Sequence, residues 1–86
     1  MGMPVIASFD GIVIKMYFAP GEHNPPHFHA YYNEYGAAFD IRTGSILDGN
    51  LPGKQKALVV RWASACRERL MKIWETQEFE KIPPLK

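Results

Sequence analysis

The chain is poor in cysteine and in net charge, and it has no long hydrophobic run. Its single cysteine, Cys66, excludes an internal disulfide and indicates a reducing compartment. Ten basic residues balance nine acidic ones, so no overall positive field attracts nucleic acid, and a polyanion would need a local patch. No apolar run approaches the roughly 18–20 residues that span a bilayer, and the first ten residues lack the basic and apolar regions of a secretory signal. These absences predict a cytoplasmic protein without a membrane segment.

What the chain does contain fits one globular domain, residues 1–86. Of its 86 residues, 47% are hydrophobic and 22% are charged, which excludes a disordered tail, a collagen-like repeat and a long coiled coil. A domain of this size buries only about 60% of the surface that its unfolded chain exposes, so its own stability is marginal. We therefore expect a partner chain, or a second copy in a homodimer, to help stabilise it.

The first half of the chain has the pattern of short strands separated by turns. Asp10-Gly11 is a strong two-residue hairpin signal, and Asn33-Glu34 and Thr43-Gly44 mark two further turns. Apolar and polar residues alternate between the turns, as they do in half-buried strands. The pattern predicts four strands and a short fifth between about residue 4 and residue 48, at residues 4–9, 11–18, 27–32, 35–42 and 45–48.

The second half predicts one long helix, from about residue 53 to about residue 79, because residues 54–80 contain neither glycine nor proline. At about 1.5 Å per residue this helix is roughly 35–40 Å long, and it would overhang strands of about 17–20 Å. The overhang, with Val60 and Met71 on its polar side, would offer a contact to another chain. Eight residues share the apolar arc of the helix: Leu58, Val59, Trp62, Ala63, Cys66, Leu70, Ile73 and Trp74.

The sequence thus predicts an α+β fold. A small antiparallel sheet of four to five strands, within residues 4–48, packs against one long C-terminal helix, residues 53–79. An extended C-terminal tail follows, since Pro83-Pro84 is incompatible with a helix. Ile82 and Leu85 make this tail either a loose end or a clip that holds on to the domain.

All three histidines fall within seven residues, in the run His23-Asn24-Pro25-Pro26-His27-Phe28-His29. Strand alternation places His27 and His29 on one face of the sheet and turns Phe28 inward. The two prolines restrict the backbone and would swing His23 toward the other two. An imidazole titrates near neutral pH, so a pair can hold one acid and one base at once.

Three interpretations of the cluster stay open. In an acid/base site for RNA, one imidazole takes the 2′-hydroxyl proton and another protonates the leaving oxygen, while Lys15, Arg42 or Arg61 stabilises the negative charge. In a metal site, the imidazoles bind zinc, nickel, iron or manganese, with Glu22 or Glu34 as an oxygen ligand. In a purely structural role, the rings bond to backbone carbonyls and fix the entry into a strand.

The remaining reactive and aromatic residues give weaker signals. Cys66, Trp62 and Trp74 lie on the apolar arc, which predicts core residues rather than a nucleophile or a cofactor site. Four tyrosines lie near the histidines in sequence, and they would either stack on bases or pack in the sheet: Tyr17, Tyr31, Tyr32 and Tyr35.

The chain resembles the family called domain of unknown function 4160 (DUF4160). Two runs carry the resemblance: Gly-Ile-Val-Ile-Lys-Met-Tyr-Phe at residues 11–18 and His-Asn-Pro-Pro-His-Phe-His-Ala at residues 23–30. It extends to residues 3–6 at the start, residues 53–74 in the helix and residues 82–85 at the end. The resemblance implies a small bacterial protein, the toxin of a type II toxin–antitoxin pair, with His23, His27 and His29 as its functional positions.

The resemblance also implies a partner, a small antitoxin of the DUF2442 type or a helix-turn-helix protein. We therefore expect a toxin that acts on RNA as a metal-independent ribonuclease without a cofactor. Two alternatives remain, a non-catalytic interaction module that binds a partner chain, and a histidine-based metal-binding protein. The residues expected to be catalytic are His27, His29, His23, Lys15 and Arg42.

Overall fold

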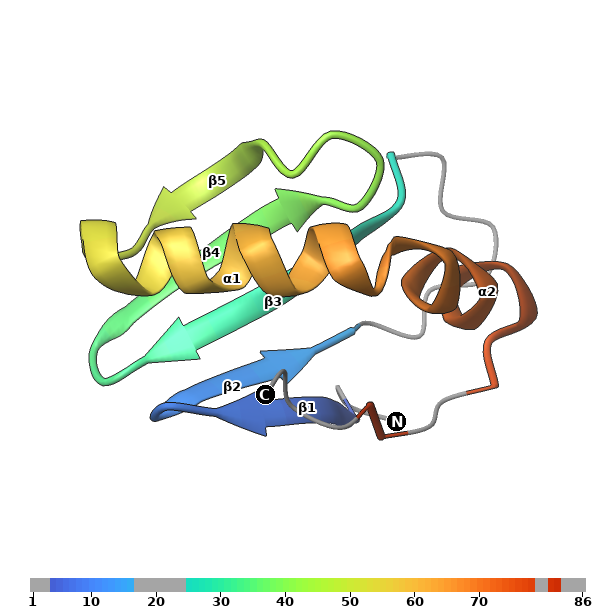
Figure 1. The fold of residues 1–86 in the computed structure, drawn as a ribbon, viewed down its shortest axis with the longest axis horizontal. Coiled ribbons are helices and arrows are strands. Elements are labelled where there is room, and N and C mark those ends of the chain that lie inside the picture. The colour runs from blue at the N-terminus through green and yellow to red at the C-terminus, as the bar shows by residue number, and fades with distance from the viewer. Residues whose placement is uncertain (1–3, 17–24, 79–80, 83–86) are drawn as a thin grey trace.

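The computed structural model describes residues 4–16, 25–78 and 81–82, and it combines an antiparallel sheet with two helices. Each strand pairs with its neighbours in the chain, in the order β1-β2-β3-β4-β5, so the sheet is a simple meander. Figure 1 shows α1 lying across one face of the sheet and α2 lying at one end of it. The α+β prediction is confirmed. The elements are β1 Val5–Phe9, β2 Ile12–Lys15, β3 His27–Tyr32, β4 Tyr35–Asp40, β5 Ile46–Asn50, α1 Gly53–Ala65 and α2 Arg67–Thr76.

The turns between the strands use the residues that the sequence indicated. Asp10 (φ 51°) and Gly11 (φ 78°) both adopt positive φ, which a two-residue hairpin of matching twist requires. Asn33 (φ 52°) begins the turn between β3 and β4. The fourth strand was predicted to reach residue 42 but ends at Asp40, because the Asp40 carboxylate folds the following residues into a turn. Its Oδ1 accepts hydrogen bonds from the N–H groups of Arg42 (2.7 Å) and Thr43 (3.2 Å).

The prediction of one long helix is wrong, because the helical segment bends at Cys66 (φ −111°, ψ 17°) and forms two helices. The N–H group of Cys66 still donates to the Trp62 carbonyl (3.0 Å), and its carbonyl accepts from the N–H of Leu70 (2.9 Å). The bend therefore costs little hydrogen bonding, and it turns α2 back toward the sheet. Leu70 and Ile73 are buried as a result, with at most 1% of their surface exposed.

The bend also removes the overhang that was predicted as a contact for another chain. Val60 and Met71, which a straight helix would leave on its polar side, are half-buried and pack against the core. A straight helix of this length would leave its second half without a sheet to cover, so its apolar residues would face water. The bend shortens the layer of helices above the sheet and buries the apolar residues of the second half. Residue 79, the predicted end of the helix, lies outside the described residues.

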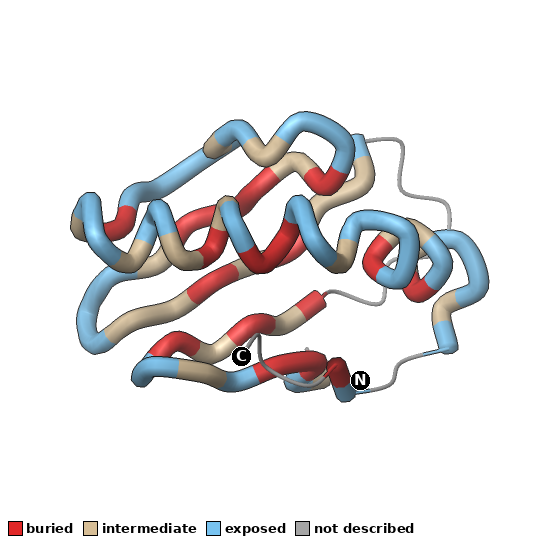
Figure 2. The backbone as a smooth tube through the Cα atoms, in the orientation of Figure 1, coloured by how far each residue is buried: buried red, intermediate tan, exposed pale blue. Residues whose placement is uncertain are grey.

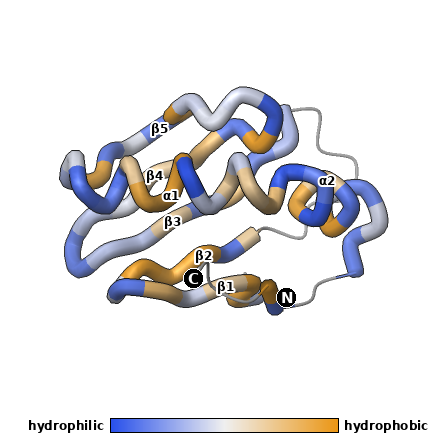
Figure 3. The backbone as a smooth tube through the Cα atoms, viewed as in Figure 1, coloured by the Kyte–Doolittle hydropathy of each residue, from blue (hydrophilic) through white to orange (hydrophobic). Residues whose placement is uncertain are grey.

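The core lies between the sheet and the two helices, as Figure 2 shows. Phe28 stacks on Phe39 across two strands, with ring centroids 5.3 Å apart, and meets Trp62 of α1 edge-on at 5.6 Å. Both Phe28 and Trp62 are buried, as predicted, whereas Cys66 and Trp74 are only half-buried. Figure 3 shows hydrophilic and hydrophobic residues alternating along both helices, as helices covered on one side require.

The C-terminal segment crosses the edge of the sheet. The N–H group of Ile82 donates to the carbonyl of Ile6 in β1 (2.6 Å), and the Ile82 side chain is 3% exposed. Of the two alternatives for the tail, the clip is therefore the correct one at Ile82; Leu85 lies outside the described residues. Over the part of the chain that the structure describes, neither helix is long and apolar enough to cross a membrane.

Candidate functional site

Strand β3 sets the orientation of the two described histidines. Along it the side chains alternate, with Phe28 and Ala30 buried toward α1 and His27 and His29 half-buried on the other face. The pleat of a strand points successive side chains to opposite faces, and burial of Phe28 fixes which face that is. The prediction that the two imidazoles share one face is confirmed.

The two imidazoles form a close pair. Their ring centroids are 5.3 Å apart and their planes meet at 73°. Nδ1 of His27 lies 2.9 Å from the carbonyl oxygen of Pro25. Since a carbonyl oxygen only accepts, Nδ1 of His27 is the nitrogen that carries the proton of this hydrogen bond. The prolines before β3 thus orient one ring of the pair.

Neighbouring strands supply the surroundings of the pair. His29 lies opposite Lys15 of β2 and Ala38 of β4. Tyr31 stacks beside His29, with centroids 6.2 Å apart and planes at 10°, and Nζ of Lys15 lies 5.7 Å from the Tyr31 centroid. The structure therefore brings Lys15, a residue predicted for the site, to the histidines.

A fourth ring comes from α2. The indole of Trp74 lies 5.1 Å from the imidazole of His27, measured between ring centroids. Trp74 was predicted to be a core residue. No local pattern signals its contact with His27, because the contact exists only once α2 has turned at Cys66. We call the four residues Trp74, His27, His29 and Tyr31, which follow one another in this order, the ring row.

Burial affects the protonation of His29. The pKa of its imidazole is lowered, first because burial penalises the charged form and next because His27 is a neighbouring group of the same charge type. Asp48 opposes both effects. It lies across from Ala38 in the pairing of β4 with β5, so only that small side chain separates it from His29 in the register. The Nε2 atom of His29 is buried. These effects together favour the uncharged form of His29.

The other predicted site residues lie elsewhere. Arg42 is exposed in the turn after β4, and the described contacts do not join it to the histidines. Arg61 is exposed on α1, which covers the opposite face of the sheet. Glu34 is exposed in the turn between β3 and β4. His23 and Glu22 lie outside the described residues.

Metal binding was the second interpretation of the cluster. Within residues 4–16, 25–78 and 81–82, no three His, Cys, Asp or Glu side chains converge on a point where an ion would sit. Zinc and its neighbours in the first transition row take at least three protein ligands in most sites. The described residues supply the two imidazoles of the pair, so they do not by themselves form such a site.

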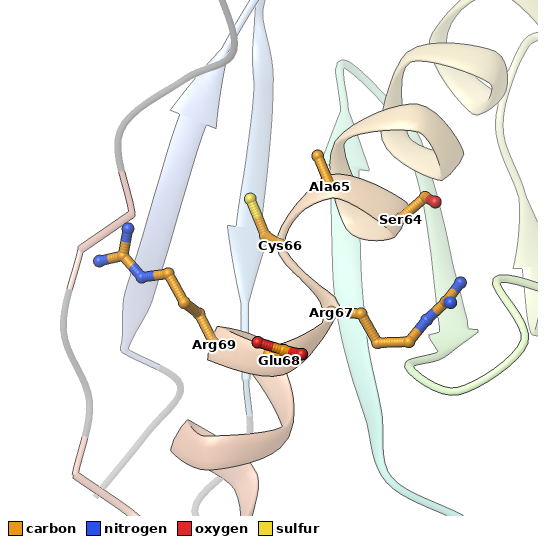
Figure 4. A pocket seen from close by; sticks show the side chains of 6 residues that line it. All are labelled: Ser64, Ala65, Cys66, Arg67, Glu68 and Arg69. Carbon is orange, nitrogen blue, oxygen red and sulfur yellow. The ribbon is translucent and has the colours of Figure 1, made fainter.

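A concave feature lies apart from the histidines, at the junction of the helices. It is an open hollow of about 530 Å³, and Figure 4 shows Arg67 and Arg69 pointing away from each other across it. Arg67 Nε donates to the carbonyl of Ile41 (3.2 Å), which ties the start of α2 to the turn that follows β4. Burial raises the pKa of the Cys66 thiol, although Arg69 partly opposes this. A thiol held protonated is a poor nucleophile, in agreement with the prediction that Cys66 is not one. The lining residues are Ser64, Ala65, Cys66, Arg67, Glu68 and Arg69.

The fold and the ring row define a small α+β protein that carries a histidine pair on one face of a meander sheet. The family model described as "Domain of unknown function (DUF4160)" matches residues 11–75, so the chain belongs to this family. This confirms the resemblance seen in the two runs at residues 11–18 and 23–30. No curated protein and no solved structure shows a significant match to the chain.

Proposed function

We propose that this protein is the toxin of a type II toxin–antitoxin pair and that it cleaves RNA with the histidine pair. The observation that supports the chemistry is the 5.3 Å separation of the His27 and His29 rings, with Lys15 on the adjacent strand. Two imidazoles at this distance can serve one phosphodiester as base and acid. A lysine beside them can stabilise the charge that develops on the phosphoryl oxygens.

The environments of the two rings favour different roles. His29, whose lowered pKa favours the uncharged form, is suited to take the proton from the 2′-hydroxyl group at Nδ1, because its Nε2 is buried. The freed 2′-oxygen attacks the adjacent phosphorus, and the bond from phosphorus to the 5′-oxygen breaks. The leaving 5′-oxygen then takes a proton from Nε2 of His27, whose Nδ1–H stays bound to the Pro25 carbonyl. The products are a 2′,3′-cyclic phosphate and a 5′-hydroxyl end, and no metal takes part.

Growth of cells that express the protein alone tests the toxin role. Induction in a host without homologues is expected to stop growth, whereas the His27→Ala, His29→Ala double variant is expected to grow normally. Lys72→Ala, which removes an exposed cation of α2 far from the pair in sequence, is the matched control and should stay toxic. Coexpression of a small antitoxin, of the DUF2442 or helix-turn-helix type, should restore growth. Normal growth with the unchanged protein would refute the toxin role.

The nuclease role is tested separately with purified protein. Incubation with labelled RNA, with and without ribosomes, should give fragments with 2′,3′-cyclic phosphate ends, and a chelator should leave the rate unchanged. Lys15→Ala should slow cleavage by about 10- to 100-fold, as the loss of one charge-stabilising group typically does. Intact RNA under both conditions would rule out the nuclease, and loss of activity with chelator would transfer the chemistry to a metal.

A further inference from the structure

The ring row is longer than proton transfer requires. Trp74 adds a ring at one end, 5.1 Å from His27, and Tyr31 adds one at the other, 6.2 Å from His29. All four rings are half-buried, so each keeps some surface exposed to solvent. Acid/base chemistry uses only the central two rings, which leaves the outer two without a role in the reaction.

Tyr31 lies against the sheet because of a glycine on the next strand. Gly36 is its partner on β4, and a Cβ atom built there would lie 3.0 Å from Cδ1 and 3.1 Å from Cε1 of the Tyr31 ring. Only a residue without a side chain lets the ring come this close to the backbone of β4. The Tyr31 ring therefore packs against the backbone of β4 and lies over the sheet.

We infer that the ring row is a platform for single-stranded RNA, with bases stacking on Tyr31 and on Trp74 to either side of the histidine pair. This rests on the proposed function and names the form of RNA on which it acts. Bases of a single strand can turn out and stack on side-chain rings, whereas bases in a duplex are already paired and stacked on each other. A sheet that presents a row of aromatic rings therefore selects for unpaired strands.

The charge beside the row fits the same ligand. Nζ of Lys15 lies 5.7 Å from the Tyr31 centroid, so a phosphate next to a base stacked on Tyr31 would meet a cation. The nearest described acidic group of β4, Asp40, is engaged by the N–H groups of Arg42 and Thr43. Asp48, on the outer strand β5, lies beyond Ala38 in the register, so it is on the opposite side of His29 from Lys15.

Binding of an oligonucleotide that cannot be cleaved tests this inference apart from catalysis. Two probes are compared. One is a fluorescent eight-nucleotide RNA whose 2′-O-methyl groups replace the attacking hydroxyls, and the other is the same strand in a perfect duplex. Fluorescence anisotropy should show at least about 10-fold tighter binding of the single strand. Tyr31→Leu and Trp74→Leu should each weaken that binding by about 5- to 150-fold, the range for losing one stacked base, and Tyr31→Phe should restore it.

Tyr35→Leu is the matched control, because this tyrosine is 42% exposed at the hairpin end of β4 and is not part of the ring row. It should bind like the unchanged protein, and circular dichroism should show all variants folded. Equal affinity for duplex and single strand, or unchanged binding by folded Tyr31→Leu and Tyr31→Phe alike, would overturn the inference. Single-strand binding without RNA cleavage would retain the platform and reject only the nuclease.

Discussion

His27 in β3 and Trp74 in α2 lie with their ring centroids 5.1 Å apart, so the candidate site is built from both the sheet and the second helix. The two helices, which meet at the bend at Cys66, have different roles. The 13-residue α1 covers the sheet, and α2 contributes a ring to the site. The position of α2 depends on the residues that it buries. The integrity of the ring row is therefore linked to the core.

Leu70 tests this dependence. It is fully buried, and Leu70→Ala is expected to lower the free energy of unfolding by about 2–5 kcal/mol, the cost of the lost contacts and the cavity. Lys72→Ala, exposed on the same helix, should change it by less than about 0.5 kcal/mol. Urea unfolding followed by circular dichroism measures both. Equal effects of the two substitutions would mean that α2 does not pack as described.

The lowered pKa of His29 predicts a pH dependence of stability. Because the folded chain binds the proton at His29 less readily than the unfolded chain does, its contribution to stability is present above the unfolded pKa. It is lost as the pH falls below about 6.5, the ordinary value for histidine, where the unfolded state takes up the proton first. His29→Gln should make the fall in unfolding free energy between pH 7.5 and pH 5 less steep. A slope in the variant as steep as in the unchanged protein would contradict the assignment.

Gly49 and Gly53 form a matched pair for testing the edge of the sheet. Gly49 adopts φ 78°, and a Cβ atom there would collide with the carbonyl oxygen of Gly36. Gly49→Ala should therefore destabilise the protein by about 2 kcal/mol or more, from the strained φ and the collision together. Gly53→Ala, at the start of α1 with nothing within 4 Å of the new Cβ atom, should be neutral or stabilise by up to about 1 kcal/mol. Thermal unfolding compares the two, and a Gly49→Ala protein as stable as Gly53→Ala would disprove the described pairing of β4 with β5.

Ile82 tests the clip across β1. Its side chain is buried and its N–H group binds the Ile6 carbonyl, so Ile82→Ala should lower the unfolding free energy by about 2–5 kcal/mol. Lys81→Ala, at the exposed neighbouring position, is the control and should have little effect. Denaturant titrations of both variants would decide; a silent Ile82→Ala would show that the tail contributes nothing to the fold.

Cys66 offers a chemical test of the helix junction. Since burial raises the pKa of its thiol, the folded protein should react slowly with a disulfide reagent at pH 7.5 and faster as the pH rises. Arg69→Ala removes the opposing positive charge and should slow the reaction further at a given pH. Release of the coloured thiolate gives the rate, with the urea-unfolded chain as the fast reference. Reaction of the folded protein at the unfolded rate would place the thiol in solvent.

Local signals in the sequence were sufficient for most of the sheet. Asp10-Gly11 and Asn33 were recognisable as turns because few residues accept positive φ, and the alternation around Phe28 gave the face of each histidine. The bend at Cys66 had no such signal, since residues 54–80 contain neither glycine nor proline and the apolar arc continues through it. Arg42 was included in the site on charge alone, and the turn formed by Asp40 takes it away from the pair.

By itself, the sequence determined the α+β class, the turn positions and the shared face of His27 and His29, because each depends on residues close together in the chain. The tertiary structure decided where the helical segment divides and, through that, that Trp74 completes the ring row. It also decided that the pKa of His29 is lowered, because the burial of this ring, which outweighs the opposite effect of Asp48, depends on strands brought together by folding. The spacing of apolar residues in the sequence indicates which side of a helix or strand is apolar. Where a helix must turn depends on packing against a sheet of finite length.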